Sequence, residues 1–522
     1  MGTARGRWVL AATIAGSGLA SLDATVVNVA LARIGREFDA GFSALQWITN
    51  SYTLTLAAFI LLGGVLGDRY GRRRVFLVGT VWFALASALC AVSTSEGMLI
   101  AARALQGIGG ALLTPGSLAI ISATFAASDR SKAIGAWSGL GGIAAAIGPF
   151  LGGWLVDISW RLVFLINLPV AAVIVVLAIH HVPETRDDGL DPKQSQLDLP
   201  GAAAVVVALS GVTYALTEAG QRGGAASVVI AAVVGLIGGA AFVLIERRAA
   251  SPLIRLEMFS DRVFAATNVV TVFVYAALSL FFFLVVLQLQ VVSGWSPLAA
   301  GSSLLPVTAV MLLLSARFGA LAGRVGPRPL MTLGAVLAAG AFGLSLRIGP
   351  DASYPVDVLP TALLLGLGLS CTVAPLTAAV LEAAPRHLAG AASGINNATA
   401  RSAGLLAIAV VPSAAGLSAV GIDDAPAIDR GYGIAMIVGT GLLLAAALVS
   451  WVGIGARSAA AAQPPSTEVV PVHRSLHCAI TGPALHPADR RIAVASDPGT
   501  GADDRPAPGA SARGQADPQP LP

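Results

Sequence analysis

Charged residues are scarce in this chain of 522 residues, since Asp, Glu, Lys and Arg make up 11% of it while 56% is hydrophobic. Soluble domains usually carry about 25% charged residues. Too little polar surface remains to coat a water-soluble body, so we expect lipid to be the solvent for most of the chain. The Lys and Arg residues fall in short loops, which is typical of membrane orientation and not of nucleic-acid binding.

Cysteine is also scarce, and the residue clusters that catalysis requires are missing. Cys90, Cys371 and Cys478 show no metal-ligand spacing and no disulfide framework, so we interpret them as small side chains. The sequence contains no Walker phosphate-binding loop. No Ser-His-Asp or metal-ligand cluster is placed near a membrane segment. These absences predict that the protein is neither an enzyme nor an ATP-driven pump. They also predict that it has no cofactor and no metal.

Long apolar stretches dominate instead. A membrane-spanning helix needs roughly 20 mostly apolar residues, which predicts about fourteen spans, at 8–31, 45–67, 75–94, 98–124, 133–156, 162–181, 199–218, 225–245, 263–290, 298–322, 330–348, 358–382, 388–413 and 433–455. Spans of a β-barrel would be shorter and would alternate polar with apolar residues. The first run is too long for the core of a signal peptide, so we expect a retained helix. The predicted fold class is an all-α polytopic membrane protein.

The loop charges test this order of spans. With fourteen spans both termini lie on one side, and the loops of that side hold most of the Lys and Arg residues. The loops of the other side hold only Arg33, Arg36, Arg161, Arg222, Arg347 and Arg430. The positive-inside rule then predicts that both termini are cytoplasmic.

The chain repeats a short pattern after its second and tenth spans. Residues 64–74 read Gly-Val-Leu-Gly-Asp-Arg-Tyr-Gly-Arg-Arg-Arg, and residues 319–329 read Gly-Ala-Leu-Ala-Gly-Arg-Val-Gly-Pro-Arg-Pro. Such a repeat predicts two parallel six-helix bundles with a substrate site at their interface. We therefore expect a first bundle at 1–181, a linker with two inserted spans at 182–262, a second bundle at 263–455 and a disordered cytoplasmic tail at 456–522.

The first copy of the repeat, named the gate loop here, combines glycines, one acid and several arginines: Gly64, Asp68, Arg69, Gly71, Arg72 and Arg73. Glycine permits a tight turn and a close helix approach, and Asp68 can pair with a loop arginine or with a helix N-terminus. A simple positive-inside anchor would explain the arginines but not Asp68 or the glycines. The second copy has Gly323 in place of Asp68, so the pairing that Asp68 can make is missing there.

Two charged residues are expected within the membrane. An arginine inside a span is costly and usually faces a cavity or a partner, and Arg103 lies in the fourth span beside Gln106. Asp23 is the deepest carboxylate of the first six spans. We expect the first span to end near Leu31 and the fourth to begin near Met98. Asp23 then lies about 12 Å and Arg103 about 8 Å from the same membrane face. We hypothesise that they interact, and that proton binding to Asp23 releases Arg103; a purely structural pair is the alternative.

A proline within the fifth span marks a bend. Gly148, Pro149, Gly152 and Gly153 form a Gly-Pro-x-x-Gly-Gly pattern. Proline removes a helix hydrogen bond, and glycines let a neighbouring backbone approach closely. The stretch from Trp160 to Pro169 is interpreted as structural, with Trp160 and Arg161 as an anchor at the outer membrane interface.

Together with the stretch Leu-Asp-Ala-Thr-Val-Val-Asn at 22–28, these motifs resemble the fourteen-helix drug:proton antiporter family of the major facilitator superfamily, over about residues 8–455. The resemblance implies two six-helix bundles plus two inserted helices. It implies that the gate loop is a cytoplasmic latch, that Arg103 takes part in proton transfer, and that the Gly148-Pro149 pattern marks antiporters. Ala144 departs from the glycine that often begins this pattern.

The resemblance further implies proton-coupled efflux of drugs, antibiotics or other small organic molecules across the cytoplasmic membrane by alternating access, by a protein that works as a monomer. Polar residues within the spans are candidates to line the substrate cavity: Gln46, Asn50, Tyr52, Gln106, Asn268, Tyr275, Asn396, Asn397 and Arg401. The alternative function is a proton-coupled uptake carrier of the same superfamily, and a non-transporting receptor is a third. The Gly148-Pro149 pattern and the extra helix pair favour export.

Overall fold

The computed structural model describes residues 3–186, 198–222, 224–249, 252–385 and 388–455. Within these ranges the chain forms helices and no β-strand. Twelve helical segments are long and apolar enough to cross a membrane. Two further helices, α5 (Ala127–Ile158) and α15 (Ala389–Ala414), stand where the fifth and thirteenth spans are predicted. The all-helical polytopic architecture predicted from the sequence is confirmed, and the predicted tail lies outside the described residues.

The remaining helices follow the predicted order closely. In the first part of the chain they are α1 (Ala4–Phe38), α2 (Phe42–Tyr70), α3 (Arg72–Ala91), α4 (Glu96–Thr124), α6 (Leu162–Leu165) and α7 (Asn167–His181). The inserted pair comprises α8 (Leu199–Arg222) and α9 (Ala226–Glu246). In the last part they are η1 (Leu256–Ser260), α10 (Arg262–Leu287), η2 (Gln288–Val292), α11 (Pro297–Ser302), α12 (Leu305–Val325), α13 (Pro327–Ser345), η3 (Tyr354–Val358), α14 (Leu359–Ala383) and α16 (Ala425–Gly453).

Some helix boundaries differ from the prediction. The first helix continues past the predicted end near Leu31 to Phe38, because the polar segment that follows the apolar run stays helical. It stops where Asp39 adopts a left-handed conformation with φ 50°. The sixth and tenth spans are each broken into a short and a long helix, and α16 begins at Ala425, eight residues before the expected start. Hydropathy located the spans but not these polar continuations and breaks.

The repeated pattern has the same structural consequence in both copies. Gly71 separates α2 from α3 with φ 107°, and Gly326 separates α12 from α13 with φ 84°. Each glycine N–H donates to the carbonyl four residues earlier, of Gly67 and of Ala322. Residues with a Cβ rarely adopt positive φ, which explains why glycine stands at this position in both copies.

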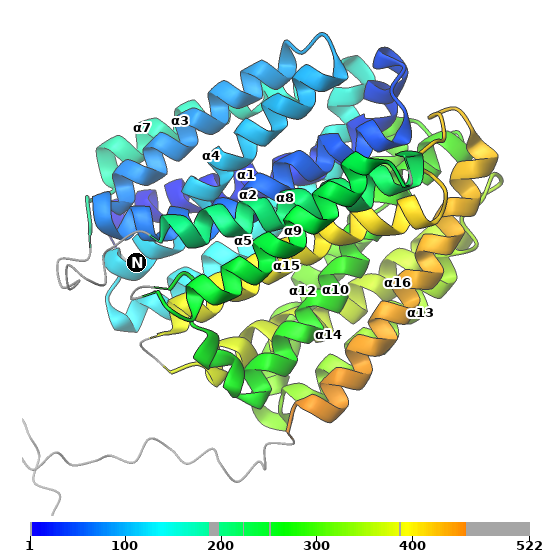
Figure 1. Cartoon of the computed structure of the whole chain (residues 1–522). Coiled ribbons are helices and arrows are strands. Elements are labelled where there is room, and N and C mark those ends of the chain that lie inside the picture. The colour runs from blue at the N-terminus through cyan, green and yellow to red at the C-terminus, as the bar shows by residue number, and fades with distance from the viewer. Residues whose placement is uncertain (1–2, 187–197, 223, 250–251, 386–387, 456–522) are drawn as a thin grey trace, which may run out of the picture. The chain divides into compact units, whose positions relative to one another are not determined.

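The helices form two groups that lie side by side, as Figure 1 shows. Within the first group, α1 packs against α5 and α7, and α4 packs against α2 and α3. Within the second group, α10 packs against α15 and α16, and α14 packs against α12 and α13. The groups meet where α2 packs against α15 and α5 against α11, and α8 contacts both α2 and α15. The division into two bundles, a linker and a tail stays a prediction.

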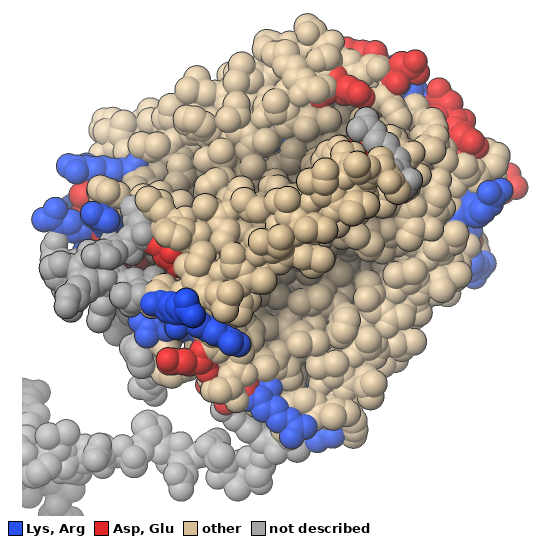
Figure 2. Space-filling view, viewed as in Figure 1, with Lys and Arg blue, Asp and Glu red and all other residues tan. Residues whose placement is uncertain are grey.

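The two ends of the helix bundle differ in charge. Figure 2 shows Lys and Arg gathered at the end that holds the N-terminus and the α2–α3 junction, whereas acidic residues gather toward the other end. We call these the basic end and the opposite end. Helix α1 begins at the basic end and reaches the opposite end near Phe38.

The described hydrogen bonds between the two groups lie at the opposite end. Gln46 Nε2 donates to the Ile408 carbonyl at 2.6 Å, and Gln290 Nε2 donates to the Val29 carbonyl at 3.0 Å. The Phe42 N–H donates to the carbonyl of Val420 at 3.1 Å. An exposed ion pair joins Arg36 to Asp423 at 3.2 Å. These contacts, named the seal here, hold the two groups together at this end.

Candidate functional site

A buried carboxylate lies at the centre of the first helix group. Asp23 on α1 is fully buried, with 0% exposure. Its Oδ2 receives a hydrogen bond from Nη1 of Arg103 on α4 at 2.5 Å. Its Oδ1 receives hydrogen bonds from Gln106 Nε2 and Asn167 Nδ2, both at 2.8 Å. A buried charge requires such partners because desolvation disfavours it strongly.

The arginine of this pair is enclosed as completely as the acid. Arg103 is 1% exposed. Its Nε donates to the Ile48 carbonyl at 3.2 Å and its Nη1 donates to Gln106 Oε1 at 2.6 Å. The guanidinium lies over the ring of Tyr52, 4.3 Å from the centroid, which adds a cation–π interaction. These groups come from α1, α2 and α4, and the ring of Phe164 in α6 also lies 5.8 Å from the guanidinium.

The expected meeting of Asp23 and Arg103 occurs, although α1 is longer than predicted. Their direct contact confirms the geometry, whereas their role in proton transfer stays a prediction. Asn167, at the start of α7, was not predicted to belong to this site, because its stretch was interpreted as structural. Ser87 on α3 was not predicted either, and its Oγ accepts hydrogen bonds from Gln106 and Asn167. A lone Asn or Ser inside apolar sequence gives little warning of such a role.

Trp160 also differs from its expected place at the membrane interface. It is 3% exposed, and its Nε1 donates to Glu37 at 2.6 Å. Arg161 donates to the same carboxylate at 2.6 Å. This segment therefore fixes the end of α1 instead of facing lipid.

The Gly148-Pro149 pattern joins α5 to two neighbours. A Cβ on Gly148 would lie 2.0 Å from Thr25 Oγ1, and one on Gly152 would lie 3.2 Å from Val26 Cα, so this side of α5 packs directly beside Asp23. On the other side, a Cβ on Gly153 would lie 2.6 Å from Leu298 Cα in α11. The close backbone approach predicted for this motif is present, and it links the neighbourhood of Asp23 to the second helix group.

The gate loop is held by contacts within its own helix group. Arg72 Nε donates to Asp68 Oδ1 at 2.8 Å, so Asp68 pairs with a loop arginine as expected. The Arg73 N–H and side chain contact Glu184, which follows α7. Arg69 lies over the ring of Tyr70. Gly64 has only Pro115 of α4 near the place of a Cβ. Thus Asp68 makes no described contact with the second helix group in this conformation.

The cavity candidates fall into three sets. Gln46 belongs to the seal, while Tyr52 and Gln106 belong to the surroundings of Arg103. Asn396 donates to Asn268 at 3.2 Å and to Thr271 at 2.7 Å, which joins α15 to α10. The third set makes no described hydrogen bond: Asn50, Tyr275, Asn397 and Arg401.

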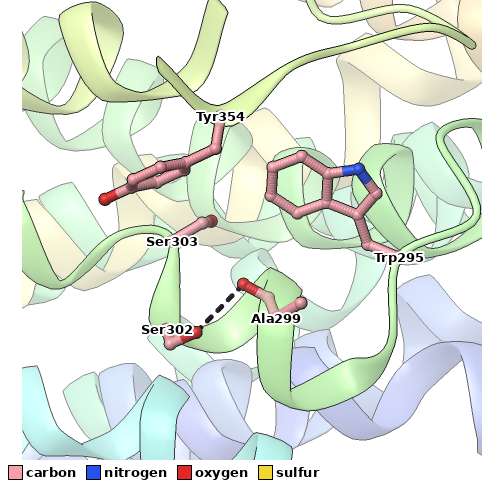
Figure 3. A pocket seen from close by; sticks show the side chains of 5 residues that line it. All are labelled: Trp295, Ala299, Ser302, Ser303 and Tyr354. Atoms are coloured by element: carbon pink, nitrogen blue, oxygen red, sulfur yellow. Dashed lines mark hydrogen bonds between the residues drawn. The ribbon is translucent and has the colours of Figure 1, made fainter.

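Two surface hollows lie outside this network. Figure 3 shows one beside α11, where the rings of Trp295 and Tyr354 lie across from each other above Ala299, Ser302 and Ser303. The second is an apolar groove between α2, α8 and α9, lined by Trp47, Tyr214 and small or aliphatic residues. Near it, Glu218 of α8 is buried and accepts a hydrogen bond from Trp47 Nε1 at 3.0 Å. Cys90 and Cys371 are buried, as expected of small side chains within apolar segments, and Cys478 lies outside the described residues.

Comparison with known proteins places this architecture in one family. Residues 13–409 match the family model of the Major Facilitator Superfamily. Puromycin resistance protein pur8 of Streptomyces alboniger is 35% identical over 89% of this chain and 94% of its own length. The multidrug resistance protein Stp of Mycobacterium tuberculosis is 35% identical over 78% of this chain and 76% of its own length. The tetracenomycin C resistance and export protein of Streptomyces glaucescens is 34% identical over the same two shares.

Solved structures share the fold. A bacterial homolog of the human lysosomal transporter Spinster, in an inward-facing and unoccupied conformation, matches with a TM-score of 0.61 at 18% identity, covering 87% of this chain and 98% of that one. The POT family transporter PepTSo matches with a TM-score of 0.59 at 17% identity, covering 85% and 96%. At such identities the likeness concerns the fold alone. This chain therefore belongs to the major facilitator superfamily and is a multi-pass membrane transporter, not an enzyme.

Proposed function

We propose that this protein exports small organic molecules, antibiotics among them, from the cytoplasm in exchange for protons. The relatives named for drug resistance and export support the direction. The buried Asp23–Arg103 pair supports the coupling, because a carboxylate inside the membrane has a proton as its simplest alternative partner. This pair is the single observation on which the proton-coupled mechanism depends.

The proposed cycle begins with the pair intact, as it is in this conformation. Protonation of Asp23 removes the negative charge that holds Arg103, so the guanidinium must find other acceptors. Asp23 lies two and three residues before Thr25 and Val26, on which the glycines of α5 pack. A change of protonation at Asp23 can therefore reach the α5–α11 contact between the helix groups. With the seal on the outer side, exchange requires that Asp23 takes up its proton while the seal is open and releases it while the seal is closed. The proton therefore favours closing of the seal, and the deprotonated, substrate-loaded protein favours its opening.

The proposed orientation places the basic end, and with it both termini, in the cytoplasm of the cell. The seal would then close the outer side, and the gate loop would lie on the inner side. Asp68, which pairs with Arg72 here, would act as a latch that engages the second group when the inner side closes. The protein would work as a monomer with protons and a small-molecule substrate as its partners.

Accumulation assays in a drug-sensitive host test this function. The wild-type protein is expected to lower cellular accumulation of at least one antibiotic or dye from a broad panel, and a protonophore is expected to abolish the effect. Asp23→Asn should lose export, whereas Asp39→Asn, the same change at the exposed end of the same helix, should retain it. Export that survives the protonophore, or that survives Asp23→Asn undiminished, would rule out the proposed coupling.

A further inference from the structure

Arg401 stands near the middle of α15 and has no acidic partner. No described residue forms an ion pair or a hydrogen bond with its guanidinium. The carboxylates on the described spans of the second group lie near helix ends, at Asp357, Glu382 and Asp429. An unpaired charge at this depth is costly, and intramembrane charges usually serve a function. Arg103 is matched by Asp23, whereas the charge of Arg401 is matched by no protein group described.

The register of α15 on α2 directs Arg401 toward the first helix group. A Cβ on Gly394 would lie 3.3 Å from Leu61 of α2, and the Ile408 carbonyl accepts a hydrogen bond from Gln46 of α2. Positions 394, 401 and 408 follow one another at intervals of seven residues. Seven residues make about two helical turns, so the three positions share one face of α15. Arg401 therefore faces α2 between these two contacts, at the junction of the two helix groups.

Two further polar side chains without partners surround the same place. Asn50 follows Gln46 by four residues and so lies on the α15-facing side of α2. It is fully buried, and neither its Oδ1 nor its Nδ2 has a hydrogen-bond partner. Tyr275 on α10 makes no described hydrogen bond, and its carbonyl oxygen lies 3.8 Å from the place of a Cβ on Gly404, which follows Arg401 by three residues on α15. Buried polar groups are almost always paired in native proteins, so the unpaired amide of Asn50 indicates a missing ligand. Arg401 and Tyr275 are partly exposed beside it, where such a ligand can reach them.

The chemistry of these groups defines the ligand. The guanidinium, the amide Nδ2 and the phenol O–H are all hydrogen-bond donors. Planar guanidinium groups bind paired oxygens with two parallel hydrogen bonds. A permanent cation would meet repulsion from Arg401, whereas a carboxylate or an ionised phenol would supply the missing charge.

We propose that Arg401, Asn50 and Tyr275 bind an anionic oxygen group of the transported molecule, a carboxylate or an acidic phenol. The site rests on the proposed export function and adds the substrate class to it. The protein selects organic anions and zwitterions over permanent cations, and the bound anion neutralises Arg401 as Asp23 neutralises Arg103.

Efflux of two dyes of opposite charge tests this site. Cells are loaded with fluorescein, an anion that enters as its diacetate, or with ethidium, a permanent cation. Wild-type protein should speed fluorescein efflux and leave ethidium unchanged. Arg401→Gln should slow fluorescein efflux at least tenfold, and Arg401→Lys should retain part of it. The matched control Arg347→Gln, an exposed arginine at the opposite end, should behave as wild type.

Asn50→Leu and Tyr275→Phe separate binding from folding. Each variant keeps the charge of Arg401 and removes one donor, so the fluorescein concentration for half-maximal efflux should rise several-fold while the maximal rate stays within twofold. Protein amounts in the membrane are compared by immunoblot for every variant. Unchanged half-saturation in both variants would overturn the assignment of these donors.

The remaining outcomes also decide the question. Ethidium export that Arg401→Gln leaves intact would overturn the proposal, and so would an equal loss of both dyes at normal protein amounts. If neither dye is exported, growth protection is measured against antibiotics grouped into carboxylic or phenolic acids and permanent cations. Protection against cations alone contradicts the anion site but preserves the export function. Protection against none removes the export function and the site with it.

Discussion

Asp23 and Arg103 are buried side by side, with two amide groups completing the hydrogen bonds of the carboxylate. Such a pair contributes little net stability, because the attraction only repays the loss of hydration. Removal of one partner is far more damaging, since the other charge then stays buried without compensation. The structural role of each residue can therefore be separated from its role in transport.

A double-mutant series makes that separation. Asp23→Asn is expected to destabilise the protein by about 3–5 kcal/mol because Arg103 loses its counter-charge. Adding Arg103→Met should recover much of this stability without restoring export. Thermal unfolding of purified protein in detergent measures the first effect. A double variant no more stable than Asp23→Asn would contradict the charge-pair interpretation.

From the sequence, contacts within the site could be predicted only for the charged residues. The depth of Asp23 and Arg103 in their spans predicted the pair, because charges in lipid must find partners. Asn167 was missed, since an amide at the start of a helix gives no signal of what it contacts. The absence of partners around Arg401 could not be predicted either, because it depends on the register between α15 and α2.

At the level of helices, hydropathy predicted the order and approximate ends of the helical segments, and twelve of those described are long and apolar enough to cross a membrane. It could not predict the helical extension to Phe38 or the break at Ile166, because polar residues at a membrane face can continue a helix or end it. The glycines were more informative. Gly71, Gly148 and Gly326 each stand where the turn or the packing leaves no room for a side chain or requires positive φ.

The contact between α5 and α11 depends on one further glycine. A Cβ on Gly301 would lie 2.1 Å from the Pro149 carbonyl oxygen, so Gly301→Ala must push the two backbones apart. Overpacking of this kind typically costs 1–3 kcal/mol. We expect a lower melting temperature and weaker export. Gly343→Ala, on an exposed helix face with nothing within 4 Å, is the matched control and should be neutral or slightly stabilising.

The inserted helices also join the two groups. Besides the Glu218–Trp47 hydrogen bond to α2, Gln221 Nε2 donates to the Ser418 carbonyl, and Ser413 Oγ on α15 donates to the Thr217 carbonyl at 3.3 Å. Helix α8 therefore braces the seal from one side. In a transporter that opens this end, these hydrogen bonds must break or move with one group.

At the scale of the whole molecule, the described conformation is joined at the opposite end, while Asp68 of the gate loop is paired within its own group. Alternating access requires the reverse arrangement at another point of the cycle. The seal must therefore be reversible, and any covalent bond across it should trap the protein.

A disulfide across the seal tests that requirement. A Cβ on Gly35 lies 3.5 Å from the Cβ of Ile422, within the range that disulfides need. In a background with Cys90, Cys371 and Cys478 replaced, oxidation of the Gly35→Cys/Ile422→Cys variant should stop export, and reduction should restore it. The oxidant should not change export by either single-cysteine variant. Full cross-linking with undiminished export would show that the seal does not open during transport.

Transport in proteoliposomes tests the role of Asp23 most directly. The compound that the wild-type protein exports best is measured in two modes, exchange at equal pH and accumulation driven by a pH gradient. The Asp23→Asn/Arg103→Met variant, whose buried charges are balanced, is expected to lose gradient-driven accumulation at least tenfold, whereas Asp39→Asn should keep both modes. Gradient-driven accumulation by the double variant at the wild-type rate would contradict the assignment of Asp23 as the proton-coupling residue.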